Sequence, residues 1–296
     1  MIRILLSLFL VLAAAAPALA QTRVVATTTS MAVLARTVGG DAVSVTTLAP
    51  PDRDVHYLQA KPSMMRRLRR ADLLLAVGAE LEVGWLPAAL RNAANPGIRP
   101  GHQGYFEAAA QVELTGTYQR ADRAMGDVHP AGDPHVNLDP VRMARVAEAL
   151  AARLAKLEPA AAEAFRRRAE GFGKQVQKRL PGWQERVADS PGVVAFHKDI
   201  NYLMDRLGVP IRGYLEPKPG IAPSASHLKR LIADLKARPA GVIIRHPYHP
   251  RDPVRKVADA TGWRTAALPL DPELGAGAEA YFALIDAYVA AIAGDR

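Results

Sequence analysis

The chain alternates between short apolar runs and segments with helical periodicity, and this alternation limits its possible folds more than any other feature. The apolar runs predict strands over residues 23–27, 43–48, 73–77, 193–196, 211–215, 242–245 and 265–270. Helices are predicted between them, over residues 31–38, 62–70, 85–92, 141–157, 200–207, 225–237, 253–261 and 279–293. Strands that alternate with helices form parallel sheets covered on both faces. The sequence therefore predicts an α/β fold.

One long helical pattern, over residues 160–187, divides the alternation into two halves. Its apolar side chains recur at a spacing close to 3.6, at Phe165, Phe172, Val176, Leu180, Trp183 and Val187. Gly171, Gly173 and Pro181 interrupt the pattern, which predicts a bend or a weakened turn. The simplest architecture is two Rossmann-like lobes with parallel sheets joined by one long helix: an N-terminal lobe over 21–159, a linking helix over 160–189 and a C-terminal lobe over 190–296.

Residues 1–20 have the features of a cleaved signal peptide. Arg3 precedes an apolar run over residues 4–16, and Ala18-Leu19-Ala20 forms a small-x-small cleavage site. The mature chain is expected to begin at Gln21 and to be a soluble, exported, periplasmic protein.

The charge distribution argues against a nucleic-acid-binding protein. The chain has 38 Lys and Arg against 29 Asp and Glu, a formal charge of +9, but the basic residues are scattered. Aromatic residues make up 6% and do not alternate with basic ones, so no stacking platform for bases is predicted.

The chain contains no cysteine. This excludes disulfides, iron–sulfur clusters, thiolate zinc sites and a cysteine nucleophile, as well as the lipid-bearing cysteine of a bacterial lipoprotein. Any metal site must therefore be built from imidazoles and carboxylates.

Four such side chains stand where a ligand would bind in parallel sheets. His56, His197 and Asp271 each follow a predicted strand, and His135 closes a long polar loop over 115–138. Ligands bind beyond the carboxyl ends of such strands. Three imidazoles and one carboxylate form a tetrahedral shell suited to Zn(II), with metal-to-ligand distances of roughly 2.0–2.2 Å. Mn(II) prefers more oxygen ligands. A lone histidine at a strand end is also commonly a hydrogen-bonded cap. The spacing of the four residues in the sequence does not by itself establish that they meet at one site.

Sequence blocks around these residues resemble the metal-specific solute-binding proteins of zinc and manganese ABC transporters, the cluster A-I family. The resemblance runs from about Val24 to the C-terminus. Its blocks are Asp54-Val55-His56-Tyr57, Lys61-Pro62-Ser63, Val77-Gly78-Ala79-Glu80-Leu81-Glu82, Asp133-Pro134-His135-Val136-Asn137, Phe196-His197-Lys198-Asp199-Ile200-Asn201 and Leu268-Pro269-Leu270-Asp271-Pro272-Glu273.

The resemblance implies that His56, His135, His197 and Asp271 are metal ligands and that two similar lobes are joined by one helix. The third of these ligands, His197, is a histidine, and in this respect the chain resembles the zinc-binding branch of the family. It further implies a monomeric, non-enzymatic periplasmic carrier that delivers Zn(II) to an ABC permease in the inner membrane, with a metallochaperone as a further candidate partner. No Walker sequence occurs, so the ATPase is expected to be a separate chain.

The sequence departs from this family at two places. Zinc-uptake members often have a long His-rich insertion before the second ligand, whereas this chain has only His129 there, which is either a transient ligand or an ordinary loop residue. His246 and His249 follow a strand where the family more often has an acidic residue, and they are either accessory groups or parts of a proline-stiffened turn.

Carboxylates usually orient the ring of a histidine ligand by accepting its other N–H. The candidates for this role are Asp54, Asp133, Asp199 and Glu216.

Three other functions remain open from the sequence: a manganese carrier of the same family, a zinc-dependent hydrolase that uses the three histidines, and a surface adhesin with a structural metal. Four protein ligands would leave no coordination position for an activated water, which separates a carrier from a hydrolase.

Overall fold

A computed structural model of the chain describes residues 21–117, 129–273, 275 and 277–295. The predicted signal peptide lies outside these residues, as does most of the polar loop before His135. Within the described ranges, no helix combines the length and apolar character that a membrane crossing requires.

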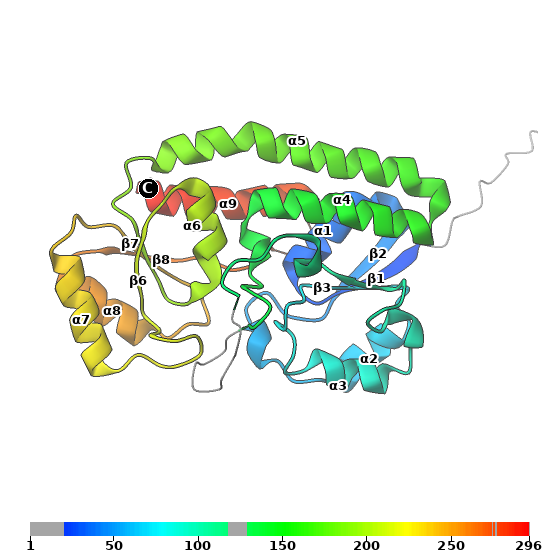
Figure 1. Cartoon of the computed structure of the whole chain (residues 1–296), viewed down its shortest axis with the longest axis horizontal. Coiled ribbons are helices and arrows are strands. Elements are labelled where there is room, and N and C mark those ends of the chain that lie inside the picture. Colours follow the sequence, from blue (N-terminus) through cyan, green and yellow to red (C-terminus); the bar gives the residue numbers. More distant parts are fainter. Residues whose placement is uncertain (1–20, 118–128, 274, 276, 296) are drawn as a thin grey trace, which may run out of the picture.

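The strands form two parallel four-stranded sheets with the same spatial pattern (Figure 1). The first sheet has the order β2-β1-β3-β4 and contains β1 (Thr22–Ala26), β2 (Val43–Thr47), β3 (Leu73–Ala76) and β4 (Tyr105–Glu107). The second has the order β6-β5-β7-β8 and contains β5 (Val193–Ala195), β6 (Ile211–Tyr214), β7 (Val242–Arg245) and β8 (Arg264–Ala267). Strand β4 was not predicted, because three residues are too few to show a periodicity.

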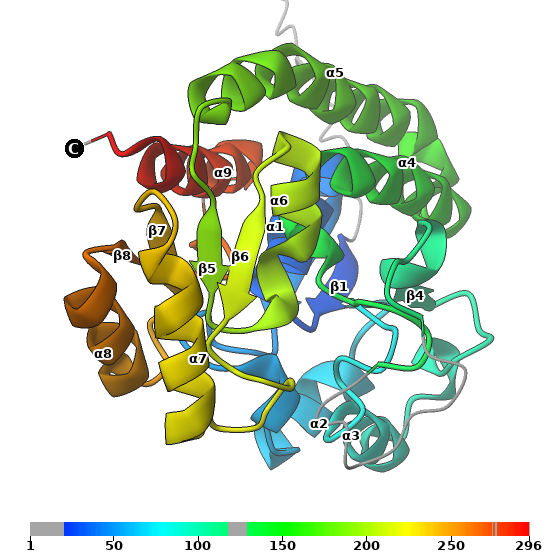
Figure 2. The ribbon, with the colours of Figure 1, turned by 60° about the vertical axis from the view of Figure 1, so that its left-hand side comes forward.

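Helices cover both sheets, as the alternation predicts. Those of the first half are α1 (Thr29–Gly39), α2 (Pro62–Arg69), α3 (Leu86–Ala93), α4 (Pro140–Leu157) and α5 (Ala162–Val187). Those of the second half are α6 (Asn201–Leu207), α7 (Ala225–Lys236), α8 (Arg251–Thr261) and α9 (Gly277–Ala293). Figure 2 shows α7 and α8 on the outer side of the second sheet and α6 on the side of the first lobe. The two-lobed α/β fold is confirmed.

Local sequence signals set the starts of several helices. The Thr28 hydroxyl accepts the Met31 N–H at 3.3 Å and caps α1. Asp139 accepts the N–H groups of Val141 and Arg142 at the start of α4, whose first residue is Pro140. A side-chain oxygen at this position replaces the hydrogen-bond partner that the first turn lacks, and proline fits there because its missing N–H is not needed.

The long helix α5 continues through Pro181, and its axis is arched in Figure 1. It packs along α4, α1 and α9. Of its predicted apolar face, Leu180 is only partly buried, and the buried members are Phe165, Phe172, Val176, Trp183 and Val187.

The main hydrophobic core is continuous between the two lobes. It includes Leu75 from β3 and Ala195 from β5, together with α5, α6 and α9. The C-terminal helix α9 packs on α1 of the first lobe, and its Phe282 ring stacks on Phe172 with centroids 5.3 Å apart. A separate, smaller core lies between the second sheet and α7 and α8. The lobes are thus joined by shared packing as well as by α5, which holds the ends of the two sheets facing one another.

Candidate metal centre

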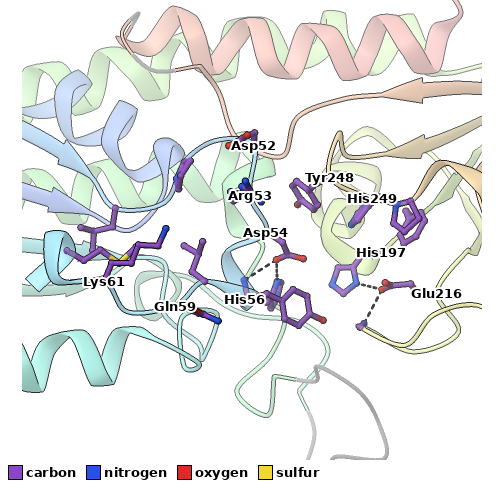
Figure 3. Close-up of a pocket in the computed structure, with 18 of the residues that line it drawn as sticks. Asp52, Arg53, Asp54, His56, Gln59, Lys61, His197, Glu216, Tyr248 and His249 are labelled. Carbon is purple, nitrogen blue, oxygen red and sulfur yellow. Dashed lines mark hydrogen bonds and ion pairs between the residues drawn. The ribbon is translucent and has the colours of Figure 1, made fainter.

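Two of the predicted ligands are presented by the same local structure. His56 lies in a short 3-10 turn, Val55–Tyr57, and His135 immediately precedes another, Val136–Leu138. The carboxylate two residues earlier accepts the backbone N–H of each histidine at 3.0 Å and its ring Nδ1–H at 2.7 Å; these carboxylates are Asp54 and Asp133 (Figure 3 draws the first pair). An Asp-x-His sequence is therefore the local signal for an oriented imidazole.

His197 is oriented by a residue from the neighbouring strand. It follows β5, and its Nδ1 lies 2.8 Å from Oε2 of Glu216, which follows β6 (Figure 3). The same oxygen accepts the Gly220 N–H at 3.1 Å. The parallel pairing of β5 with β6 places the two residues side by side, and the Glu216 N–H donates to the Phe196 carbonyl at 3.0 Å.

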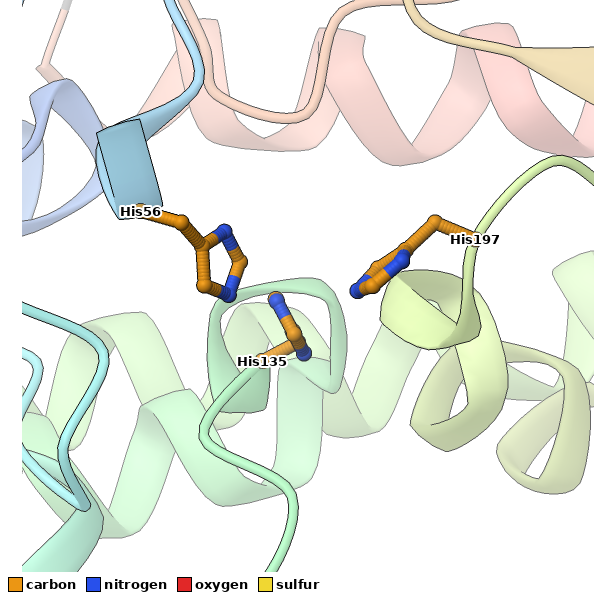
Figure 4. A group of neighbouring side chains, drawn as sticks. All are labelled: His56, His135 and His197. Atoms are coloured by element: carbon orange, nitrogen blue, oxygen red, sulfur yellow. The ribbon is translucent and has the colours of Figure 1, made fainter. Parts of the chain in front are cut away.

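The three rings face one another. Because each Nδ1–H donates to a carboxylate, the neutral form of each ring has its lone pair on Nε2, where a metal ion can bind. One ligand atom from each of His56, His135 and His197 lies within 4.8 Å of the others, and Figure 4 shows the rings turned toward a common space. The Nε2 of His135 is buried and has no hydrogen-bond partner among the described residues. A buried nitrogen without a partner is costly unless a ligand occupies the site, so this donor set fits a metal ion.

Asp271 lies next to this group but outside the three-histidine cluster. Its Oδ1 accepts the Ser30 N–H at 3.0 Å, near the start of α1. With His56 and His135 it lines a cavity of about 10 Å³, which has room for about one water-sized sphere. Burial raises the pKa of this carboxyl. Asp271 therefore lines the same small cavity as two of the three rings.

The environment of His197 favours its charged form in the absence of metal. Burial lowers its pKa, but the Glu216 hydrogen bond and the charges of Asp199, Glu216 and Asp54 outweigh that effect and raise it to about 9. A metal ion that binds Nε2 must therefore displace a proton from this ring near neutral pH.

His129 reaches the cluster from the end of the polar loop. Its Nε2 lies 3.2 Å from the Nε2 of His56, and its ring centroid is 6.0 Å from that of His135. Burial, together with the nearby His135 and His56, lowers the pKa of His129 to about 3. His129 is thus a neutral imidazole beside the three rings, where a transient ligand would lie.

His246 and His249 have different surroundings. Both ring nitrogens of His246 are engaged, Nδ1 with the Leu268 carbonyl at 2.7 Å and Nε2 with Oδ2 of Asp199 at 2.9 Å. Burial lowers the pKa of His246, but the Asp199 carboxylate raises it overall. Since both ring nitrogens are engaged with acceptors, the ring has no nitrogen left for a metal. The Nδ1 of His249 accepts the backbone N–H of His246 at 3.1 Å, and the His249 ring stacks on Phe196 with centroids 4.2 Å apart.

Three of the four carboxylates expected to orient rings thus contact a candidate ligand: Asp54, Asp133 and Glu216. Asp199 contacts His246 instead. Asp199 could not be distinguished from the others by its place in the sequence, because its partner lies 47 residues away at the end of another strand.

Curated relatives of this chain include zinc uptake proteins. It is 28% identical over 157 residues to the high-affinity zinc uptake system protein ZnuA of Brucella abortus (strain 2308), a match that covers 52% of this chain and 47% of that protein. The chain thus spans about half the length of that relative. A protein of the same name from Yersinia pestis is 25% identical over 274 residues, which cover 88% of this chain and 85% of the relative.

Solved structures share the fold. A crystal structure of ZnuA superposes with a TM-score of 0.74 at 20% identity and covers 92% of this chain and 99% of its own. The solute-binding protein FpvC from Pseudomonas aeruginosa, in complex with Mn²⁺, superposes with a TM-score of 0.75 at 24% identity and covers 94% and 100%. The laminin-binding protein Lmb of Streptococcus agalactiae, described as bifunctional with adhesin and metal transporting activity, has a TM-score of 0.74 at 20% identity and covers 92% and 100%.

The family model described as zinc-uptake complex component A, periplasmic, matches residues 24–294. The chain therefore belongs to the ZnuA family.

Proposed function

We propose that this protein binds one Zn(II) ion between its lobes and delivers it to an ABC importer. The ligands are His56, His135, His197 and Asp271, with Asp54, Asp133 and Glu216 holding the three rings. The observation that carries the proposal is the Nε2 of His135, which is buried and has no hydrogen-bond partner among the described residues, in a ring whose ligand atom lies within 4.8 Å of one from each of the other two imidazoles. Three nitrogens and one oxygen match the tetrahedral preference of zinc.

The cellular setting follows from the same proposal. The protein acts as a monomer in the periplasm, reached through a signal peptide cleaved after residue 20. Its partners are a permease in the inner membrane, with the ATPase on a separate chain, and a metallochaperone is a further candidate donor of zinc. Family membership and the zinc uptake names of the relatives support this setting.

A carrier is favoured over a hydrolase because a fourth protein ligand would occupy the position that a catalytic water needs. Asp271 is the candidate for that position, since it lines the small cavity with His56 and His135. A manganese carrier is less well supported, because three imidazoles offer few of the oxygen ligands that Mn(II) prefers.

Metal titration tests the function. The mature, metal-free protein is titrated with Zn(II) and with Mn(II) in competition with a chelator of known affinity. We expect one tight Zn(II) per chain and weak Mn(II). Tight Mn(II) with weak Zn(II) would instead establish the manganese carrier, and metal-dependent turnover of ester or peptide substrates would establish the hydrolase.

Variants test the ligands. His197→Ala should lower zinc affinity by about tenfold or more, because one of the imidazole ligands is lost. Asp271→Ala should cost less than a histidine variant if the carboxylate mainly closes the site. His102→Ala, in a polar loop of the first lobe, is the matched control and should bind zinc like the wild type. Unchanged affinity in His197→Ala would show that the ligand assignment is wrong.

A further inference from the structure

The space beside the candidate metal centre is far larger than a metal ion requires. A cavity of about 1030 Å³ lies between the lobes and is lined by His56 and His197 (Figure 3). His135 and Asp271 line the separate cavity of about 10 Å³ instead. Cavities of roughly 300–1000 Å³ hold small organic ligands. An ion at the cluster would thus be buried on the His135 side and open to a ligand-sized cavity on the His56 and His197 side.

The wall from the first lobe has cations whose side chains have no partner among the described residues. Arg53 and Lys61 line the cavity, and neither side chain makes a hydrogen bond or ion pair with any other residue that the structure describes. Arg67 also lines it and donates from Nη1 to the Thr47 carbonyl at 2.8 Å. These side chains can donate to anionic groups of a ligand.

The carboxylates that line the cavity equal these cations in number. They are Asp52, Asp54 and Glu216, and the last two each accept a hydrogen bond from a histidine ring, at 2.7 and 2.8 Å. A bound Zn(II) would therefore give the cavity a net positive charge, and the two histidine-bound carboxylates are already engaged on their own rings.

The wall from the second lobe is aromatic. Phe196, Tyr248 and His249 line the cavity, and the His249 ring stacks on Phe196. Since Nδ1 of His249 accepts the His246 N–H, the ring proton of neutral His249 lies on Nε2, which is a donor. This wall offers flat packing surface and one neutral hydrogen-bond donor.

We propose that the interlobe cavity binds a small polycarboxylate chelator together with the zinc ion, so that the protein can take up a metal–carboxylate complex. The inference rests on the proposed function, because the ion holds the chelator from the His56 and His197 side. The charge of the zinc ion attracts one carboxylate of the chelator, which lies against the His56 and His197 side while the four protein ligands stay in place. The remaining carboxylates pair with Arg53 and Lys61.

Equilibrium dialysis with citrate as the probe tests this inference. The full mature protein is dialysed against zinc and radiolabelled citrate, and both are measured in the protein chamber. Zinc affinity without citrate is measured for every variant. The test variant is the double substitution Arg53→Gln and Lys61→Gln. Its matched control is Arg66→Gln with Arg70→Gln, which removes the same charge from exposed residues outside the cavity.

We expect zinc-loaded protein to retain citrate in a ternary complex and metal-free protein to retain less. Citrate affinity should fall about tenfold or more in the cavity variant and remain near wild type in the control. The inference is overturned if citrate only strips zinc from the protein, or if both double variants weaken citrate binding equally. Absence of zinc binding both with and without citrate would overturn the metal site itself, and the inference with it.

Discussion

The orientation of each candidate ligand depends on a carboxylate that lies behind its ring. Asp54 and Asp133 each accept a hydrogen bond from the histidine two residues later in the chain, whereas Glu216 reaches His197 from the next strand. Each carboxylate fixes the tautomer that leaves Nε2 free in the neutral ring. For His197, the carboxylate partner also raises the pKa of the ring, so a proton competes with the metal there.

This competition gives zinc binding a definite pH dependence. With the pKa of His197 raised to about 9, the ring of the metal-free protein keeps its proton below that pH, and zinc binds only the neutral ring. Zinc affinity should therefore be highest above about pH 9 and should fall about tenfold per pH unit as the pH drops from 9 toward 7. Calorimetry at pH 8 in buffers of different ionisation enthalpy should report about one proton released per zinc.

Glu216→Gln is the variant that isolates this effect. The neutral amide removes the Glu216 charge, which raises the pKa of His197, while Asp199 and Asp54 still raise it, so the proton release at pH 8 should decrease. Glu185→Gln, an exposed position on α5, makes the same chemical change without touching the site and should release protons like the wild type. Equal proton release in the wild type and Glu216→Gln would show that another group titrates.

At the scale of elements, one buried carboxylate joins the two lobes near the second ligand. Asp139 is fully buried; it caps α4 and also accepts Nε and Nη2 of Arg206, on α6, both at 3.0 Å. Arg142 donates to the same carboxylate at 2.5 Å and lies over the Tyr202 ring. The Tyr202 hydroxyl in turn donates to the Asp133 carbonyl at 2.9 Å. This network ties the loop that carries His135 to the second lobe.

Asp139→Ala should destabilise the protein by about 3 kcal/mol, because it removes a helix cap and leaves two arginines without their partner. Chemical denaturation measures this change. Asp252→Ala, which breaks the exposed Arg255–Asp252 pair on α8, is the matched control and should change stability by less than about 1 kcal/mol. Similar losses in the two variants would contradict a structural role for the interlobe pair.

At the scale of the whole molecule, the lobes share one core. Helix α9 belongs to the second half of the chain, yet it packs on α1 and α5, and the main core runs from the first sheet to one face of the second. Tyr288, on α9, is fully buried and donates its hydroxyl to the Pro269 carbonyl at 3.0 Å, which attaches α9 to the segment that carries Asp271. Shared packing of this kind favours cooperative unfolding.

We expect one thermal transition in calorimetry, with equal calorimetric and van't Hoff enthalpies, and a higher midpoint with zinc. Phe282→Ala should lower the stability of the whole molecule by about 3–5 kcal/mol, since it opens a cavity between α9 and α5. Val83→Ala, at a side chain that is 63% exposed, should have little effect. Two separate transitions in the wild type would show that the lobes unfold independently.

The sequence alone determined the features that depend on neighbouring residues. Periodicity predicted the parallel α/β lobes and the long helix, because the period of the apolar pattern differs between helices and strands. The Asp-x-His sequences contain both partners of an oriented ring, since the hydrogen bonds span two residues. Three candidate ligands, His56, His197 and Asp271, were also identifiable from their places after strands, and His135 from its place at the end of the polar loop; the family blocks surround all four.

Only the tertiary structure decided the contacts between distant segments. The parallel pairing of β5 with β6 brings Glu216 to His197, and the ends of β5 and β7 pair Asp199 with His246, which the spacing of these residues could not distinguish. The packing of α9 on α1 and the ligand-sized cavity between the lobes are likewise absent from any local pattern. These features arise from how whole elements pack, because burial and shape complementarity act between surfaces that the chain order does not place together.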